Sequence, residues 1–170
     1  MSDKTKYFFR DENTKDEWLT PPELVNALGQ FDLDPASPIN RPWPTASKHY
    51  TVADDGLSQI WESRVWMNPP YGSQIKKWMD KLSLHGNGIA LVFARTETKW
   101  FHKYCWQRAT GIFFFEGRIA FSHVNGVRGM PAMASSCLVI YGKNNRDAVL
   151  DAIKSGGIKG IYVEAYDKKP

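Results

Sequence analysis

The sequence predicts an α/β fold in which helices flank a mostly parallel central sheet, and two observations carry this prediction. Continuous apolar runs, of the kind that parallel sheets bury on both faces, recur at residues 65–67, 89–93, 111–115 and 136–141. Between two of these runs, residues 75–84 place apolar side chains at the spacing of one helical face. Strands that alternate with helices in this way favour a layered α/β architecture.

The remaining elements follow from local cap and turn signals. Thr20 and Glu23 form a Thr-x-x-Glu capping box with prolines between them, which predicts a helix that begins there and ends near Leu28. Further helices are expected at residues 99–108 and 146–154, and further short strands at residues 31–34, 48–52, 119–121 and 158–163. Residues 35–45 form a long Pro-rich loop, and residues 122–131 are expected to form a mobile basic loop.

The chain is expected to form a single domain over residues 18–170, preceded by a flexible polar arm at residues 1–17. Its 170 residues, of which 42% are hydrophobic, suffice for one sizeable core. No membrane span is predicted, and the N-terminus lacks the apolar stretch of a signal peptide. Cys105 and Cys137 are too few and too far apart for a disulfide framework or a zinc site. A cytoplasmic protein without a bound metal is therefore expected.

The tetrapeptide Asn68-Pro69-Pro70-Tyr71 follows directly on the apolar run at residues 65–67. Its two prolines forbid both a helix and a continuing strand ladder, so they hold the neighbouring groups on a stiff turn. In open α/β sheets, ligands bind at the carboxyl ends of strands. The Asn68 amide oxygen and the Pro69 carbonyl can accept hydrogen bonds from one exocyclic amino group, and Tyr71 offers a face to a planar ring. The segment suits an amine on an aromatic heterocycle, and the alternative is a Pro-Pro turn without chemistry.

The tetrapeptide resembles the catalytic motif of S-adenosylmethionine-dependent amino-methyltransferases, and such a reaction needs a site for the methyl donor. Asp34 ends an expected strand and can pair with the donor's α-amino group, while Ala36 and Ser37 are small enough for close backbone approach. Asp55 can accept the amino group of the donor's adenine, with Leu57 packed on the ring. Each segment alone is also consistent with an ordinary turn.

A third candidate donor segment is the start of the first predicted helix. Trp18, Thr20 and Pro21 form a rigid lead into that helix, and its backbone amides can meet the donor's carboxylate. An ordinary capped helix is the alternative. The glycine-rich loop of other methyltransferase families is absent, because Pro35-Ala36-Ser37-Pro38 stands in its place. No acidic residue that would bind the donor's ribose is evident either.

Together these segments resemble the phage-type Dam family of DNA N6-adenine methyltransferases, from Trp18 to about Tyr141. The resemblance depends on the order and spacing of W-x-T-P-P at residues 18–22, L-D-x-A-S at 33–37, Asn40, D-G-L at 55–57, Trp61, N-P-P-Y at 68–71, A-R-T-x-T-x-W-F at 94–101 and G-R-I-x-F at 117–121. It implies a Rossmann-like methyltransferase fold, S-adenosylmethionine as the methyl donor, and adenine N6 in DNA as the acceptor.

An adenine in duplex DNA must be flipped out of the helix to reach such a site. Candidate DNA contacts are Arg95 and Lys99, which follow the strand beside the tetrapeptide, and Arg118, Phe121 and Arg128 further along. The formal net charge of +4 has the sign that a polyanionic partner requires, but it only permits nucleic-acid binding. Arg118 and Arg128 are at least as well suited to a solvated surface, and Phe121 is better suited to the core than to a DNA contact.

Two other functions remain open from the sequence. The same tetrapeptide serves methylation of RNA bases and of protein glutamines, although those families usually keep a glycine-rich donor loop. A remnant that binds DNA or the donor without turnover is the third possibility. The sequence leaves open the DNA sequence that is recognised, the oligomeric state, and whether the role is protection from restriction or regulation.

Overall fold

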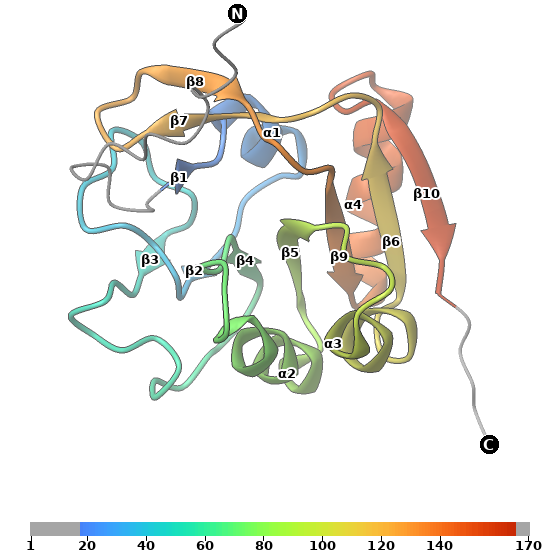
Figure 1. Cartoon of the computed structure of the whole chain (residues 1–170), viewed down its shortest axis with the longest axis horizontal. Coiled ribbons are helices and arrows are strands. Elements are labelled where there is room, and N and C mark those ends of the chain that lie inside the picture. The colour runs from blue at the N-terminus through green and yellow to red at the C-terminus, as the bar shows by residue number, and fades with distance from the viewer. Residues whose placement is uncertain (1–17, 166–170) are drawn as a thin grey trace, which may run out of the picture.

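A computed structural model of the protein describes residues 18–165, so the predicted arm at residues 1–17 and the final residues 166–170 lie outside the described part (Figure 1). The larger of its two sheets has the strand order β10-β6-β9-β5-β4-β2-β3. These strands are β2 (Leu33–Asp34), β3 (Lys48–His49), β4 (Val65–Met67), β5 (Gly88–Phe93), β6 (Gly111–Phe115), β9 (Ser136–Tyr141) and β10 (Gly160–Glu164). The smaller sheet is antiparallel and consists of β1 (Trp18–Leu19), β7 (Ala120–His123) and β8 (Arg128–Pro131).

The seven-stranded sheet is mixed, which corrects the prediction of a mostly parallel one. β3, β2, β4 and β5 pair in parallel. In contrast, β9 runs antiparallel to both β5 and β6, and β10 runs antiparallel to β6. All six residues of β9 are buried. An apolar run therefore reports burial of a strand on both faces, and it does not report the strand's direction.

Helices cover both faces of this sheet and enclose two hydrophobic clusters. On one face lie α2 (Ile75–His85), α3 (Lys99–Phe101) and a π-helical segment, η1 (His102–Trp106); on the other lie α1 (Pro22–Ala27) and α4 (Lys143–Lys154). Successive side chains of a strand point to opposite faces. Accordingly Val65 and Met67 enter the first cluster, and Trp66 enters the second. This arrangement confirms the α/β layering expected from the sequence.

Two local predictions are wrong because pairing across the chain overrides local signals, and a third is confirmed only in part. Residues 128–131, expected within a mobile loop, form β8 and pair with β7. The helix expected at residues 99–108 is only partly α-helical, since the N–H of Gln107 donates to the carbonyl of His102 at 3.1 Å. Thr20 does not cap α1: Pro21 holds the N-cap position, and no side chain caps the helix. The chain before it is instead extended as β1.

A polar network fixes the start of β4. The Arg64 guanidinium donates to the carbonyl of Leu28 at 2.9 Å and to Asn145 Oδ1 at 2.7 Å. Asn145 is fully buried, and its amide donates in turn to the carbonyl of Tyr141 at 2.8 Å. These bonds tie the loop before β4 to α1 and α4 on one face of the sheet. These bonds fix the amino end of β4, and the tetrapeptide follows its carboxyl end.

Candidate active site

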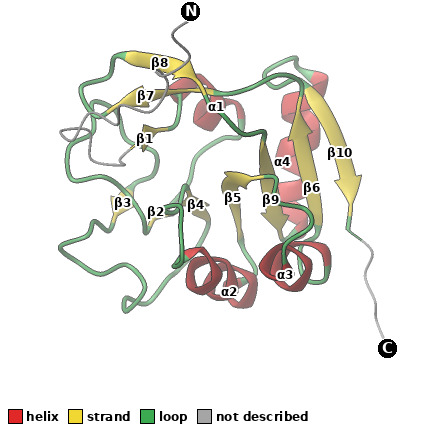
Figure 2. Cartoon of the chain, in the orientation of Figure 1, coloured by secondary structure: helices red, strands yellow, loops and turns green. Residues whose placement is uncertain are grey.

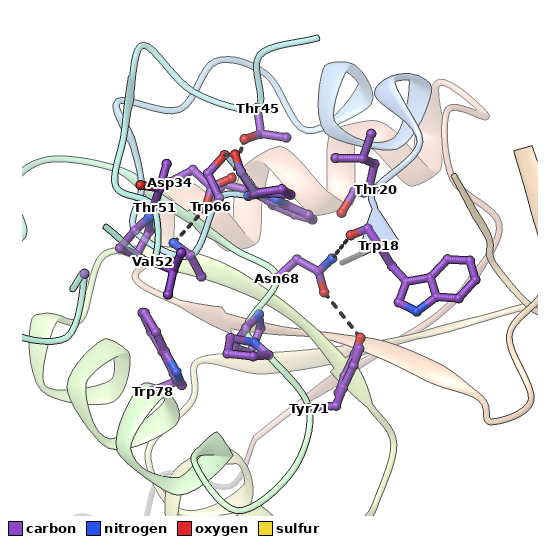
Figure 3. A pocket seen from close by; sticks show the side chains of 18 of the residues that line it. Trp18, Thr20, Asp34, Thr45, Thr51, Val52, Trp66, Asn68, Tyr71 and Trp78 are labelled. Carbon is purple, nitrogen blue, oxygen red and sulfur yellow. Dashed lines mark hydrogen bonds between the residues drawn. The ribbon is translucent and has the colours of Figure 1, made fainter. Parts of the chain in front are cut away.

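The carboxyl ends of β2 and β4 border a cavity of about 520 Å³, a size typical of small-molecule sites (Figure 3). Long loops join β2 to β3 and β3 to β4, as Figure 2 shows, and they form one side of this cavity. The lining residues are Trp18, Leu19, Thr20, Asp34, Pro35, Ala36, Ser37, Pro38, Thr45, Thr51, Val52, Asp55, Gly56, Trp66, Asn68, Pro69, Pro70, Tyr71 and Trp78. All four residues of the tetrapeptide are thus brought to one site with most of the predicted donor residues.

Asn68 is held in one orientation at the end of β4. Its Nδ2 donates to the main-chain carbonyl of Trp18 at 3.1 Å, and its Oδ1 accepts from the Tyr71 hydroxyl at 3.3 Å (Figure 3). Because the amide nitrogen is engaged by a carbonyl, the amide oxygen is fixed on the side of Tyr71. An amide oxygen has two lone pairs, so Oδ1 can accept a second hydrogen bond from a ligand.

The Tyr71 ring is supported by a second aromatic ring. Tyr71 stacks on Phe93, the last residue of β5, with ring centroids 4.1 Å apart and planes inclined by 16°. A further planar group must therefore stack on the opposite face of Tyr71. Desolvation raises the pKa of the Tyr71 hydroxyl above its ordinary value, so the hydroxyl keeps its proton and donates to Asn68 at neutral pH. Phe93 was missed by the sequence analysis because it ends a run that indicates only a core strand.

Asp34 is a buried carboxyl group at the end of β2, with 3% of its surface exposed. Its Oδ1 accepts from the N–H of Ala36 at 3.1 Å, and its Oδ2 accepts from the Thr45 hydroxyl. Burial raises the pKa of Asp34 to about 6, although these two bonds and the charge of Arg41 act in the opposite direction. A cationic group of a ligand in the cavity would favour the charged form of this carboxyl group.

Two buried polar atoms on the cavity wall have no hydrogen-bond partner among the described residues: Thr20 Oγ1 and Trp66 Nε1. The main chain of Thr20 is held, since its carbonyl accepts from Trp43 Nε1 at 3.1 Å. A buried polar group without a partner costs about 1–3 kcal/mol, so such groups call for an explanation. Both residues line the cavity, so a ligand bound there would lie close to these two atoms.

Not every predicted donor residue reaches the cavity. Trp18, Ala36, Ser37 and Asp55 line it, but Pro21 and Leu57 do not. Pro21 is buried where α1 begins, and Leu57 packs against the hydrophobic cluster beneath α2.

Gly56 was missed, and its role is steric. A Cβ at Gly56 would lie 1.9 Å from the carbonyl oxygen of Pro35. Only glycine therefore lets the turn that carries Asp55 close against the loop after β2. The sequence does show a glycine here, but the close approach to Pro35 arises only when the two loops meet in the fold.

The predicted DNA contacts fall into three places. Arg95 lines a second cavity of about 490 Å³, which Tyr71 also borders. Lys99, Arg118 and Arg128 are exposed. Phe121 is only 4% exposed and packs in the cluster beneath α1 and α4, so the structure corrects its assignment as a DNA contact.

The fold and site define an α/β protein with a ligand cavity at the carboxyl ends of parallel strands and a rigid Asn-Pro-Pro-Tyr turn on its wall. A family model described as DNA N-6-adenine-methyltransferase (Dam) matches residues 9–150. The chain therefore belongs to this family, which confirms the resemblance seen in the sequence. Comparisons with curated proteins and with solved structures found no match.

None of the helices within residues 18–165 is long and apolar enough to cross a membrane. In the same part of the chain, no group of three or more His, Cys, Asp or Glu side chains is arranged to hold a metal ion.

Asp34→Asn is expected to change how stability depends on pH. The pKa of Asp34 is about 6 in the folded protein and 3.8 without burial, so the folded state binds the proton more tightly. Stability therefore falls as the pH rises from about 4 to 6, and the loss persists above that range. The free energy of unfolding of the variant, relative to that of the native protein, should be about 2.5 kcal/mol higher at pH 7.5 than at pH 4, as measured by urea unfolding.

Asp54→Asn is the matched control for this measurement. Hydrogen bonds from Thr51 lower the pKa of the exposed Asp54, so its replacement should shift the pH dependence in the opposite direction. Equal pH dependence for the native protein and Asp34→Asn would contradict the assignment of Asp34 as a buried, raised-pKa carboxyl group.

Proposed function

We propose that the protein transfers the methyl group of S-adenosylmethionine to the N6 amino group of adenine in DNA, within a Rossmann-like methyltransferase fold. One observation carries this proposal. The chain belongs to the DNA N-6-adenine-methyltransferase family, and Asn68 is fixed at its cavity wall. The Asn68 amide nitrogen donates to the Trp18 carbonyl, and the amide oxygen can accept a further hydrogen bond. This is the geometry that an exocyclic amine requires of its acceptor.

The cavity residues fit the chemistry of the donor. When bound, S-adenosylmethionine would supply an electrophilic methyl carbon on a positively charged sulfur; as the nitrogen bonds to this carbon, the carbon–sulfur bond breaks and neutral S-adenosylhomocysteine leaves. The Asp34 carboxyl group would pair with the donor's α-ammonium group, and Thr20 Oγ1 and Trp66 Nε1–H would satisfy their unmet hydrogen bonds on its polar groups. Asp55 would accept a hydrogen bond from the amino group of the donor's adenine. The cavity of about 520 Å³ is within the range for such a ligand.

On the acceptor side, two oxygens prepare the amine. The N6 lone pair of adenine is delocalised into the ring, which makes the nitrogen a poor nucleophile. Asn68 Oδ1 and the Pro69 carbonyl would each accept one amino hydrogen and draw the nitrogen toward a tetrahedral geometry. The lone pair is then directed at the methyl carbon, and the amino group loses one proton to solvent as it gains the methyl group. Placement and preorganised dipoles, rather than a covalent enzyme intermediate, provide the rate enhancement.

The flipped adenine needs a stacking surface, and Tyr71 provides it. The ring is held on Phe93, so its position does not depend on the base. Stacking on a positioned aromatic ring offsets part of the cost of unstacking the adenine from its neighbours. Arg95, Lys99, Arg118 and Arg128 are the proposed contacts to the DNA backbone around this site.

Asn68→Ala is expected to lower kcat at least about 100-fold, because the lost oxygen acts mainly on the reacting nitrogen. Donor affinity should stay within about threefold of the native value, since the donor contacts other residues. The measurement is transfer of labelled methyl from S-adenosylmethionine to plasmid DNA that lacks adenine methylation, with nucleoside analysis of the product. Asn26→Ala, at an exposed position of α1, is the matched control and should keep native activity. Donor binding by the native protein without any N6-methyladenine would overturn the proposed function.

Thr20→Val should change stability and donor binding in opposite directions. The substitution keeps the shape of a side chain that is 2% exposed but removes its unpartnered hydroxyl. The protein without donor should become more stable by up to about 1 kcal/mol, whereas the donor should bind about tenfold more weakly. Thermal unfolding and titration calorimetry measure the two effects. The control Thr96→Val should leave donor binding unchanged. Weaker folding with unchanged donor binding would remove Thr20 from the donor site.

A further inference from the structure

The edge strand of the small sheet exposes large apolar side chains to solvent. Met130 in β8 is 85% exposed and Met133 just after it is 95% exposed, the two highest values for large hydrophobic residues in the described part of the chain. β8 is the edge strand of the small sheet, and within residues 18–165 it pairs only with β7 (Figure 1). Neighbouring exposed apolar side chains of this kind mark an interaction surface.

The residues around β8 in the sequence carry positive charges and no negative ones, and this indicates the kind of partner that β8 fits. Residues 117–146 contain no aspartate and no glutamate. Arg118 lies just before β7 and Arg128 is the first residue of β8, and both side chains are exposed. A surface with apolar and cationic groups and no acidic group complements a polyanion. It is poorly suited to a second copy of the chain, which carries a formal net charge of +4.

The strand is tied to the candidate active site through Trp18. Trp18 pairs with His123 of β7, and the two rings lie 4.7 Å apart. A Cβ at Gly129 of β8 would lie 3.1 Å from the Trp18 ring, so β8 packs closely on it. The carbonyl of the same Trp18 holds the amide of Asn68. The register of β8 against β7 shifts between Arg128 and Pro131, so side chains do not alternate strictly there. Arg128 and Met130 are nevertheless both exposed, whereas Gly129 is half-buried.

We propose that β8 is a DNA wedge: Met130 and Met133 enter the duplex where the target adenine has left it, while Arg128 and Arg118 contact the neighbouring phosphates. Apolar side chains inserted between base steps compensate for lost stacking, and arginines fix the register without reading sequence. Because a base leaves the stack only if the protein methylates duplex DNA, the wedge rests on the function proposed above. β8 offers such a surface: two exposed thioether side chains lie on and just after a hairpin without acidic residues, and this hairpin packs on Trp18, whose carbonyl holds Asn68.

The test compares three double variants at the wedge positions on duplex plasmid DNA that lacks adenine methylation. M130A/M133A and M130Q/M133Q should each lower kcat/KM for the DNA at least about tenfold, because one pair removes the apolar bulk and the other makes it polar. M130L/M133L keeps the apolar bulk and should stay within about threefold of the native value. Leu84→Ala, at a site of α2 that is 74% exposed, is the control for loss of an exposed apolar side chain and should act like the native protein.

Each outcome decides between the wedge and another role. Thermal unfolding temperatures should be equal in all variants, because both methionines are exposed. Native kcat/KM in the alanine and glutamine variants, or an equal loss in the leucine variant, would overturn the wedge. Dissociation of an oligomer in the alanine variant, with methylation of DNA unchanged, would assign the surface to a second copy and also overturn it. Failure of the native protein to methylate DNA at all would instead overturn the proposed function.

Discussion

The hydrogen bond from Asn68 Nδ2 to the carbonyl of Trp18 joins the two sheets of the molecule at the candidate site. It connects the end of β4, in the seven-stranded sheet, to β1 in the small sheet. The same bond occupies the amide nitrogen and turns Oδ1, the one side-chain acceptor that asparagine has, toward Tyr71. Without it the amide is free to rotate and present its nitrogen, which cannot accept a hydrogen from an amine. The orientation of the proposed catalytic group thus depends on a strand 50 residues away in the sequence.

The cavity is lined by rigidly held residues and also by buried polar groups that lack a hydrogen-bond partner or an ion-pair partner within residues 18–165. Stacking on Phe93 supports Tyr71, and the network around Arg64 and Asn145 supports the opposite end of β4. The same cavity contains the Asp34 carboxyl group, whose pKa is raised by burial, and two buried atoms without hydrogen-bond partners in the described part of the chain, Thr20 Oγ1 and Trp66 Nε1. Such groups destabilise the ligand-free protein, and they become favourable only when a ligand with complementary charge and hydrogen bonds is present. Residues that lower the free energy of unfolding of the ligand-free protein, gathered at one cavity wall, are consistent with a binding site.

The sequence predicts those parts of the site that depend on neighbouring residues. A stiff Asn-Pro-Pro-Tyr turn after an apolar run places Asn68 and Tyr71 correctly, because proline restricts the backbone whatever the rest of the chain does. Asp34 at a strand end is found for a similar reason. Phe93, Trp66 and Gly56 are missed, since each has its role only through a partner distant in the sequence. Pairing of distant segments also explains β1 and β8, and it explains why β9 and β10 run against the predicted direction.

Asn68 Oδ1 is proposed to accept a hydrogen bond from the target amine, beside a methyl donor held at Asp34. A crystal structure of the protein with S-adenosylhomocysteine and methylatable DNA tests this most directly. We expect an extrahelical adenine whose N6 lies about 3 Å from Asn68 Oδ1 and whose ring stacks on Tyr71. The cofactor's amino group should lie at Asp34, and Asn68 Nδ2 should still donate to the Trp18 carbonyl. A cofactor outside this cavity, or an adenine whose N6 has no contact with Asn68, would contradict it.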